Sequence, residues 1–429
     1  MRDNSETSFD ANSVSTTPSS PSETARQSDG ESAPTVLVYY GDTLSSASNG
    51  SQVRTLGLLA FLCGRYDDVV LYRYGESAGN GWPAEETAAL TSRFPQLRLV
   101  SDPDGIGLRL FDKLKKFVVL SWPGLARHAY RWAIPGRAPN FAAIRDRNSN
   151  MLYVVNYVDS LARLNGIDEN RTVVETHDLR YFRRVKGTSA SLISWKHLLN
   201  LRYEIAALAS VRALVAITGN EAYFYRNMLP SSKVYYVPDY QPVDAIPHSP
   251  EERLDYDLLF AGSGNVINRD GLLRLFESHG PRLRSLRIAL CGLICDRPEI
   301  RELATLNPNL ILLGFLSAEE LENTYARSRA CLSPTHGTGL NIKLVEALRH
   351  RKPVFASDDS RAGLTAGYER CVFPLDPDLM TSLLRDPGRL QAASEAAANY
   401  YHHFSRTGDL PALGEALDQI LSADCRPEG

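Results

Sequence analysis

Short apolar runs recur along the chain between residues 36 and 374, and most of them are continuous rather than alternating with polar positions. A short, unbroken apolar run indicates a strand that is buried on both faces. We expect a strand at each of the following segments: Val36–Tyr40, Val69–Tyr74, Leu97–Val100, Leu152–Asn156, Thr172–Thr176, Leu214–Thr218, Val234–Pro238, Leu258–Gly262, Ile288–Gly292, Leu310–Phe315, Ala330–Pro334, Val354–Ser357 and Cys371–Pro374.

Segments with helical spacing lie between most of these runs. They are Val53–Cys63, Trp195–Ser210, Asn220–Leu229, Asp270–Ser278, Glu319–Ser328 and Leu340–Arg349. Alternation of strand and helix predicts parallel sheets with right-handed crossovers. The strands fall into two sets, separated by a proline-containing stretch without periodicity. We therefore predict an α/β fold of two doubly wound, Rossmann-like domains that face each other across a cleft.

The expected boundaries follow from the same pattern. Residues 1–33 contain 13 Ser or Thr and an excess of four acidic side chains, so we predict a disordered tail. The tail lacks the apolar centre of a secretory signal. The first domain is expected at 34–240, a linker at 241–254 and the second domain at 255–390. Helices and a short tail at 391–429 close the chain.

The composition argues against several classes of function. The 429 residues carry a net charge of −3, and the part after the acidic tail sums to only +1. This balance argues against a uniformly basic nucleic-acid-binding protein. No apolar run reaches 18 residues, so no transmembrane helix is predicted. The six cysteines are scattered as in a reduced, cytoplasmic enzyme, and Cys291 and Cys295 lack the second ligand pair of a zinc site.

The strongest chemical signal is a glycine loop followed by a helix. Gly337 and Gly339 allow a ligand to approach the backbone closely, and the helix start favours phosphate. Lys343 and Glu346 are three residues apart and share one helix face. A carboxylate in this position can accept hydrogen bonds from two ribose hydroxyls. A solvated Lys–Glu pair on an amphipathic helix explains the spacing equally well.

The pattern Gly-x-Gly-x-x-x-Lys-x-x-Glu-Ala-Leu from Gly337, followed by Lys-Pro-Val, resembles the donor-site motif of GT-B glycosyltransferases. Within them it is most similar to the large retaining group called family 4. The likeness covers residues 250–429 well and 34–240 loosely. It includes Leu258–Gly264 as the opening strand and glycine loop, Leu312–Phe315 as a later strand, and Thr176–Leu179 as the strand end that places a histidine in the cleft.

This resemblance implies a cytoplasmic, hexosyltransferase-like enzyme of glycan biosynthesis. It would move a sugar from a UDP- or GDP-linked donor to a glycan, a lipid-linked sugar or a small molecule, with retention and without a metal or other cofactor. The last helix would cross back onto the first domain. The resemblance assigns His177 and Glu346 as catalytic residues. The donor would contact Gly50, Gly262, Ser263, Gly264, Arg269, His336, Gly337, Thr338, Gly339, Lys343 and Glu346.

The sequence departs from the family pattern at one important position. Many members carry two glutamates separated by seven residues, and Thr338 stands where the first would be. A bacterial subgroup with a glycine-rich loop shares this departure, and His336 or loop N–H groups would substitute. Arg269 and Lys343 are the candidates for positive charge on the diphosphate. Two alternatives stay open, a nucleotide-sugar epimerase of the same architecture and an inactive sugar-nucleotide-binding protein.

Four further features have both a functional and an ordinary interpretation. His177 is either a donor-sugar ligand or a histidine satisfied at a strand end. The loop Gly41–Ser51 either approaches the donor phosphates or only connects two elements. The basic residues Arg180, Arg183, Arg184 and Lys186 either contact phosphates or are solvated. Residues 109–147 carry nine Lys or Arg against two Asp, with aromatic residues interleaved. These residues either contact anionic lipid at the inner face of the plasma membrane or form amphipathic helices whose apolar face is buried in the core. We favour the second interpretation.

Overall fold

The computed structural model describes residues 35–44, 50–75, 81–103, 106–181, 194–240, 245–246, 254–337 and 339–423. The predicted tail and most of the predicted linker lie outside the described residues. So do Thr338, Arg183, Arg184, Lys186 and much of the loop before Gly50. Residues 34–429 form one compact unit. The domain boundaries predicted inside this unit stay predictions.

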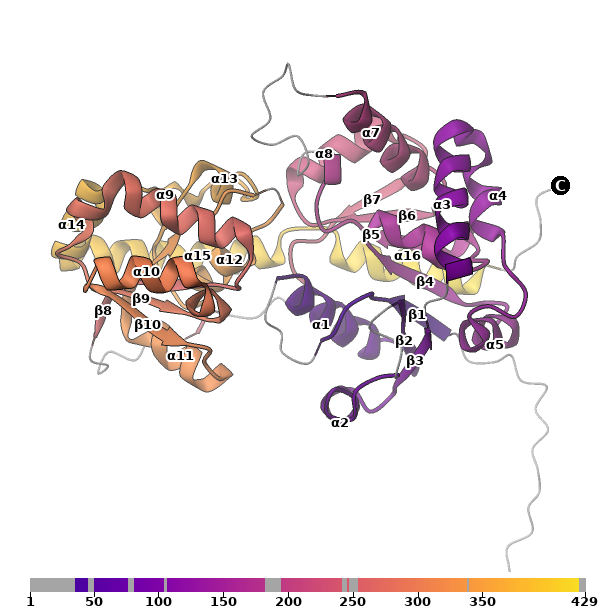
Figure 1. The fold of residues 1–429 in the computed structure, drawn as a ribbon, viewed down its shortest axis with the longest axis horizontal. Coiled ribbons are helices and arrows are strands. Elements are labelled where there is room, and N and C mark those ends of the chain that lie inside the picture. Colours follow the sequence, from indigo (N-terminus) through magenta and orange to yellow (C-terminus); the bar gives the residue numbers. More distant parts are fainter. Residues whose placement is uncertain are drawn as a thin grey trace, which may run out of the picture. The chain divides into compact units, whose positions relative to one another are not determined.

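The first seven apolar runs form one parallel sheet, as predicted (Figure 1). Its order is β3-β2-β1-β4-β5-β6-β7. The strands are β1 (Thr35–Tyr39), β2 (Asp68–Gly75), β3 (Leu97–Pro103), β4 (Leu152–Asn156), β5 (Thr172–Glu175), β6 (Ala213–Ala216) and β7 (Lys233–Tyr236).

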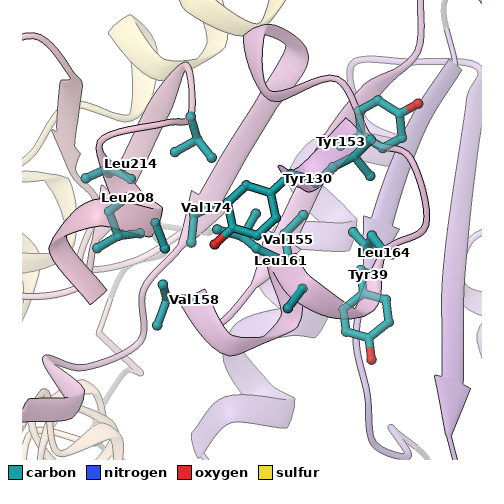
Figure 2. Packing of buried hydrophobic residues seen from close by; sticks show 14 of the residues in the cluster. Tyr39, Tyr130, Tyr153, Val155, Val158, Leu161, Leu164, Val174, Leu208 and Leu214 are labelled. Atoms are coloured by element: carbon teal, nitrogen blue, oxygen red, sulfur yellow. The ribbon is translucent and has the colours of Figure 1, made fainter. Parts of the chain in front are cut away.

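Helices cover both faces of this sheet, which explains why its strands are apolar at successive positions. Within β1, Leu37 and Tyr39 belong to one core cluster, while Val36 and Val38 belong to the other. Figure 2 shows part of the first cluster, where Tyr130 packs near the strand residues. The helices are α1 (Gly50–Cys63), α2 (Ala84–Arg93), α3 (Ile106–Ser121), α4 (Ala126–Arg131), α5 (Pro139–Arg147), α7 (Trp195–Leu208) and α8 (Gly219–Met228), with 3-10 turns η2 (Pro123–Leu125), η3 (Val158–Arg163) and η4 (Glu169–Arg171).

The other six runs form a second parallel sheet in the order β10-β9-β8-β11-β12-β13. Its strands are β8 (Tyr256–Ala261), β9 (Ile288–Cys291), β10 (Leu310–Gly314), β11 (Ser328–Ser333), β12 (Val354–Ala356) and β13 (Val372–Pro374). Its helices are α9 (Val266–Leu283), α10 (Pro298–Leu306), α11 (Ala318–Ala326), α12 (Ile342–Arg349), α13 (Asp358–Arg361) and α14 (Pro377–Arg385), with turns η6 (Leu293–Asp296) and η7 (Tyr368–Arg370). The α/β, doubly wound fold class is confirmed.

Strand order reverses once in each sheet, between β1 and β4 and between β8 and β11. At such a reversal the two neighbouring loops leave the sheet in opposite directions and open a crevice at the carboxyl ends of the strands. The loops after β8 and β11 are the two glycine loops singled out in the sequence. The topology therefore brings them together.

The last two helices connect the second sheet to the first. Helix α15 (Pro387–Arg406) packs against α12 and α14, whereas Leu413 and Leu417 of α16 (Leu410–Ser422) lie in the core of the first sheet. The Arg171 guanidinium donates to the Ile420 carbonyl at 3.0 Å. Gly408 joins the two helices at φ +138°, and a Cβ there would lie 2.5 Å from the Tyr236 carbonyl oxygen. The predicted return crossing is confirmed.

Three other expectations can be compared with the structure. The favoured interpretation of residues 109–147 is only half right. Val118, Val119 and Tyr130 are core residues, but a row of large apolar side chains on α3 and η2 is exposed. Five of the six cysteines fall in the described chain, and all five are free and buried. None of the helices described is both long and apolar enough to span a bilayer.

Candidate functional site

Three neighbouring strands of the second sheet end in closely packed glycines. Gly262, Gly292 and Gly314 lie at the ends of β8, β9 and β10. The Gly292 N–H donates to the Gly314 carbonyl at 2.7 Å. Gly292 has φ +92°, and a Cβ there would lie 2.4 Å from the Gly262 carbonyl oxygen. No larger residue fits at position 292, and the packed backbones of Gly262 and Gly292 line a cavity.

This cavity has a volume of about 370 Å³. Leu316 and Leu321 give it an apolar side, and Lys343 and Glu346 give it a charged side. Cavities of this size hold small organic ligands, usually with a few polar groups that fix their orientation. A nucleoside has this mixed character, with an apolar ring and a polar sugar.

Lys343 and Glu346 face this cavity because of the helical period of α12. Leu344, Ala347 and Leu348 occupy the opposite face and are buried in the core. The remaining face is left for the two charged residues, and both are half-buried. The solvated Lys–Glu pair considered above is therefore not what the structure contains. Both charges lie at the wall of a cavity.

Burial changes the acidity of both groups. Loss of water contact raises the pKa of Glu346, although the positive charge of Lys343 and a hydrogen bond from the Tyr325 hydroxyl oppose the change. Burial lowers the pKa of Lys343 to about 8, and the negative charge of Glu346 opposes this change. Each residue thus helps to keep the other charged.

A second cavity of about 170 Å³ adjoins the first, and both include Ser263, Ile342 and Lys343 in their walls. Its lining contains Asn265 and Asn268 at the start of α9. The start of α12 faces the same space. The amino ends of two helices therefore meet where the glycine loops after β8 and β11 come together. Helix amino ends carry partial positive charge and backbone N–H donors, which suit phosphate oxygens.

Asn341 precedes α12 but does not cap it. Its amide nitrogen donates instead to the hydroxyls of Ser333 (2.8 Å) and Thr335 (2.7 Å). Ser360 lies 3.2 Å from the same nitrogen. The side chain thus fixes the loop without satisfying the first N–H groups of the helix. This leaves a role for a ligand as the cap.

Gly50, at the start of α1, lines both cavities from the side of the first sheet. A Cβ at this position would lie 3.0 Å from Cγ1 of Ile342. The absence of a side chain lets the start of α1 come close to the start of α12. Gly50 thus lies beside the glycine loop after β11, and its contact with a donor stays a prediction.

His177 follows β5 in a strained, fully enclosed position. It has φ +59°, and its ring stacks on Tyr157 with 4.2 Å between ring centres. Its Nε2 lies 2.7 Å from Oδ1 of Asn156. The Asn156 amide nitrogen donates to the Tyr39 carbonyl, so Oδ1 is the acceptor and Nε2 carries the proton. Burial, with the charge of Arg54, holds the pKa of His177 well below 6.5. The ring is therefore neutral.

The ring of His177 lines neither of the two cavities, but its backbone lies against the glycine loop. The His177 carbonyl oxygen would be 3.2 Å from a Cβ at Gly339, which has φ +79°. Gly339 is thus needed both for its backbone conformation and for the close approach to His177. The structure brings these two predicted residues together.

Residues 255–385 match the family model of glycosyl transferases group 1.

Solved structures show the same fold over most of the chain. Sucrose-phosphate synthase from Thermosynechococcus elongatus has a TM-score of 0.61 at 14% identity, covering 91% of this chain and 98% of its own. A complex of an S. aureus TarM variant gives 0.60 at 8% identity, covering 91% and 100%. Anabaena HepE in complex with UDP and glucose gives 0.56 at 14% identity, covering 91% and 100%. At these identities the likeness establishes the GT-B fold. A comparison with curated proteins finds no sequence match.

The segment that matches the group 1 model contains Lys343, Glu346 and both glycine loops of the second sheet. Three predicted donor contacts inside it line neither cavity, and their roles stay predictions. The Arg269 guanidinium pairs with Asp270 at 2.7 Å and Glu299 at 2.8 Å. The exposed ring of His336 faces Asp359, which lines the smaller cavity, with Nδ1 3.2 Å from Oδ2. A Cβ at Gly264 would lie 3.0 Å from the Leu293 carbonyl oxygen.

Several residues of the site were not found by sequence reasoning. Tyr325 reaches Glu346 from α11, and Asn156 and Tyr157 hold His177 from the neighbouring strand β4. For Asn156 and Tyr157, the order of the strands in the sheet is the signal that would have found them. Because β4 and β5 are adjacent and parallel, polar residues at their carboxyl ends must meet.

Proposed function

We propose that this protein is a glycosyltransferase that moves a sugar from a nucleotide-sugar to an acceptor. One coincidence carries the proposal. The segment that matches the group 1 glycosyltransferase model is the segment that supplies Lys343, Glu346 and the two glycine loops to adjoining cavities at the strand-order reversal. The GT-B fold of the chain supports the same function.

In this proposal the nucleoside occupies the larger cavity. The base lies against the apolar side, near Leu316 and Leu321. The Glu346 carboxylate accepts hydrogen bonds from the ribose hydroxyls, and the Tyr325 hydroxyl orients it. A half-buried carboxylate is costly to leave without donors. Ribose hydroxyls replace the water that the nucleoside displaces.

The diphosphate then occupies the smaller cavity, beside the starts of α9 and α12. Breaking the bond between the anomeric carbon and the phosphate oxygen places negative charge on the leaving nucleoside diphosphate. The Lys343 ammonium and the helix N–H groups stabilise that charge. The acceptor hydroxyl attacks the anomeric carbon, and its proton passes to the departing phosphate. We propose that this occurs with retention and without a metal ion, since the site supplies its own positive charge.

His177 is assigned a positioning role toward the donor sugar. Its neutral ring is no general acid, because its Nε2 proton is held by Asn156 and its Nδ1 is an acceptor. The backbone carbonyl of His177 lies against Gly339, so His177 would position the donor sugar through the glycine loop. The acceptor, a glycan, a lipid-linked sugar or a small molecule, is assigned to the side of the first sheet.

Nucleotide binding tests the proposal most directly. UDP and GDP are the first probes, because the structures of HepE and the TarM variant contain UDP. A nucleotide at a hundred times its dissociation constant stabilises the fold by about 2.7 kcal/mol, which a thermal-shift panel detects. Glu346→Ala should weaken binding by about 10- to 100-fold, since it removes hydrogen bonds to a charged group. Glu302→Ala, an exposed change on α10, is the matched control.

Unchanged affinity in Glu346→Ala would remove the ribose assignment. Catalysis is tested separately, by incubating the protein with UDP-N-acetylglucosamine alone and then with acceptor mixtures. A transferase releases the nucleotide fastest when an acceptor is present. Conversion of the sugar without an acceptor indicates an epimerase, and binding without any turnover indicates an inactive binding protein. Either outcome overturns the proposal.

A further inference from the structure

Helix α3 exposes a row of large apolar side chains to solvent. Leu110, Leu114 and Phe117 recur at helical spacing on one face, and they are 60%, 48% and 58% exposed. The row continues beyond the helix with Trp122 (56%) and Leu125 (45%). Single exposed apolar residues are ordinary, but a contiguous row of five marks an interaction surface. We call these five residues the α3 row.

The exposed row does not mean that α3 is misoriented on the domain. Leu108, Val118 and Val119 on the other face of α3 are buried in the core. Lys115 is also buried there and donates to the Leu164 carbonyl at 2.9 Å. Neighbouring elements α4, α7 and η3 contact α3 without covering the row, and Figure 1 shows α4 beside α3. Helix α3 therefore has two apolar faces, of which the fold uses one.

Within residues 107–131 the exposed charged side chains are cationic, and Asp159 of η3 pairs with Lys116 of α3 at 3.7 Å. Arg109 and Lys113 are exposed on the same side of α3, and Arg127 is exposed two residues after Leu125. The one acidic residue between positions 107 and 131 is Asp112. Its carboxylate accepts a hydrogen bond from the Tyr74 hydroxyl at 2.9 Å and is half-buried. The exposed surface of this segment is thus apolar and cationic.

The aromatic residues of the row have the geometry of an exposed tip. Phe117 and Trp122 pack edge to face, with ring centres 6.3 Å apart and planes at 87°. The pair stands where α3 ends and the 3-10 turn η2 begins. The tip therefore exposes two aromatic rings next to the aliphatic side chains of α3. Aromatic side chains of this kind favour the boundary between lipid headgroups and acyl chains.

We propose that the α3 row docks the protein on a membrane surface that carries anionic lipids. The apolar side chains enter the headgroup boundary, and Lys113 and Arg127 meet lipid phosphates. The charge complementarity selects a bilayer over a second copy of the chain, whose own cationic row would repel this one. The inference does not rest on the proposed glycosyltransferase activity.

Vesicle co-sedimentation tests the proposal with the full chain. We expect binding to vesicles of phosphatidylglycerol and phosphatidylcholine, weak binding to phosphatidylcholine alone, and loss of binding as salt rises to 1 M. Lys113→Ala should weaken binding about fivefold, because it removes the contribution of one cation near an anionic surface. Leu110→Ser with Phe117→Ser should weaken it by at least tenfold. Leu306→Ser, at a site 70% exposed on α10, is the matched control and should bind normally.

Tryptophan fluorescence gives an independent measure. Quenching by lipids brominated on their acyl chains should be seen for the wild type and should fall sharply in Trp122→Phe. The proposal is overturned if anionic and neutral vesicles bind equally, or if Leu306→Ser loses as much binding as the α3 variant. It is also overturned if neither vesicle binds. A concentration-dependent rise in mass that Phe117→Ser abolishes would assign the row to a second copy instead. UDP affinity should stay unchanged in every α3 variant, which separates this test from that of the proposed function.

Discussion

Lys343 and Glu346 show how burial prepares two ordinary residues for a charged ligand. Their pKa values move toward each other, to about 8 for Lys343 and upward for Glu346. Their mutual attraction favours the charged form of each residue. The same spacing on an exposed helix would contribute only a few tenths of a kcal/mol. At the cavity wall it holds a cation beside the helix ends proposed for the diphosphate.

The lowered pKa of Lys343 predicts how nucleotide affinity depends on pH. Lys343 is charged below about pH 8 and neutral above it. UDP affinity should therefore fall as pH rises through 8, by about tenfold at pH 9 if the charge is required. Lys343→Arg keeps its charge throughout this range, so its affinity should change little. Titration calorimetry between pH 6.5 and 9 measures both proteins, and ionisation of the nucleotide affects them alike. If the affinities of the two proteins fall in parallel as pH rises, then the charge of Lys343 does not determine the pH dependence.

At the scale of elements, a buried charge pair fixes the point where the chain leaves the first sheet. Arg54 on α1 bonds Glu175 on β5 at 2.7 Å and donates to the carbonyls of Val237 (2.8 Å) and Pro238 (3.2 Å). Tyr240 donates to the other Glu175 oxygen, and its ring lies 4.8 Å from the Arg54 guanidinium. One side chain thus ties α1, β5 and the segment after β7 together, and α1 begins at Gly50.

Removing this pair should be far more harmful than removing an exposed one. Arg54→Ala leaves the Glu175 charge buried and should lower the free energy of unfolding by about 3–5 kcal/mol. Arg65→Ala breaks a pair with Asp418 whose side chains are 36% and 48% exposed, and should cost about 1 kcal/mol or less. Urea denaturation of both variants measures the difference. Similar losses would mean that Glu175 finds water or another partner when Arg54 is removed.

At the scale of the molecule, residues near the end of the chain complete the core of its beginning. Leu413, Leu417 and Leu421 of α16 share a cluster with Val36 and Val38 of β1. More than 370 residues separate these segments in the sequence. Helix α15, which leads into α16, packs on α12, the helix of Lys343 and Glu346. The C-terminal helices thus contact the site helix and the first sheet in turn.

A single substitution in α16 should therefore destabilise the first sheet. Leu417→Ala opens a cavity at a residue that is 2% exposed and should lower the free energy of unfolding by about 2–5 kcal/mol. Leu306→Ala, at a residue that is 70% exposed on α10, should change it by about 0.5 kcal/mol or less. Urea denaturation followed by circular dichroism compares the two. An equally small effect of Leu417→Ala would mean that α16 is dispensable for the first sheet.

The hydrophobic pattern predicted both sheets and the thirteen strands in the part of the chain that the structure describes, because strands buried on both faces leave an unmistakable sequence signal. It missed α2, α10, α13 and α14, which span only four to ten residues each. Gly50, Lys343 and Glu346 line the cavities, and their contacts with a donor stay predictions. Arg269 was chosen for its charge and its position after β8, but nearby carboxylates occupy its guanidinium.

The sequence by itself determined the fold class, the strands with the glycine loops that follow them, and the shared face of Lys343 and Glu346. Each of these depends on local periodicity and on the ends of strands. Only the tertiary structure decided which side chains meet across elements. It paired His177 with Asn156 and Tyr157, brought Tyr325 to Glu346, and left the α3 row exposed, because burial and pairing depend on what neighbouring elements cover. Spacing along the chain does not contain that information.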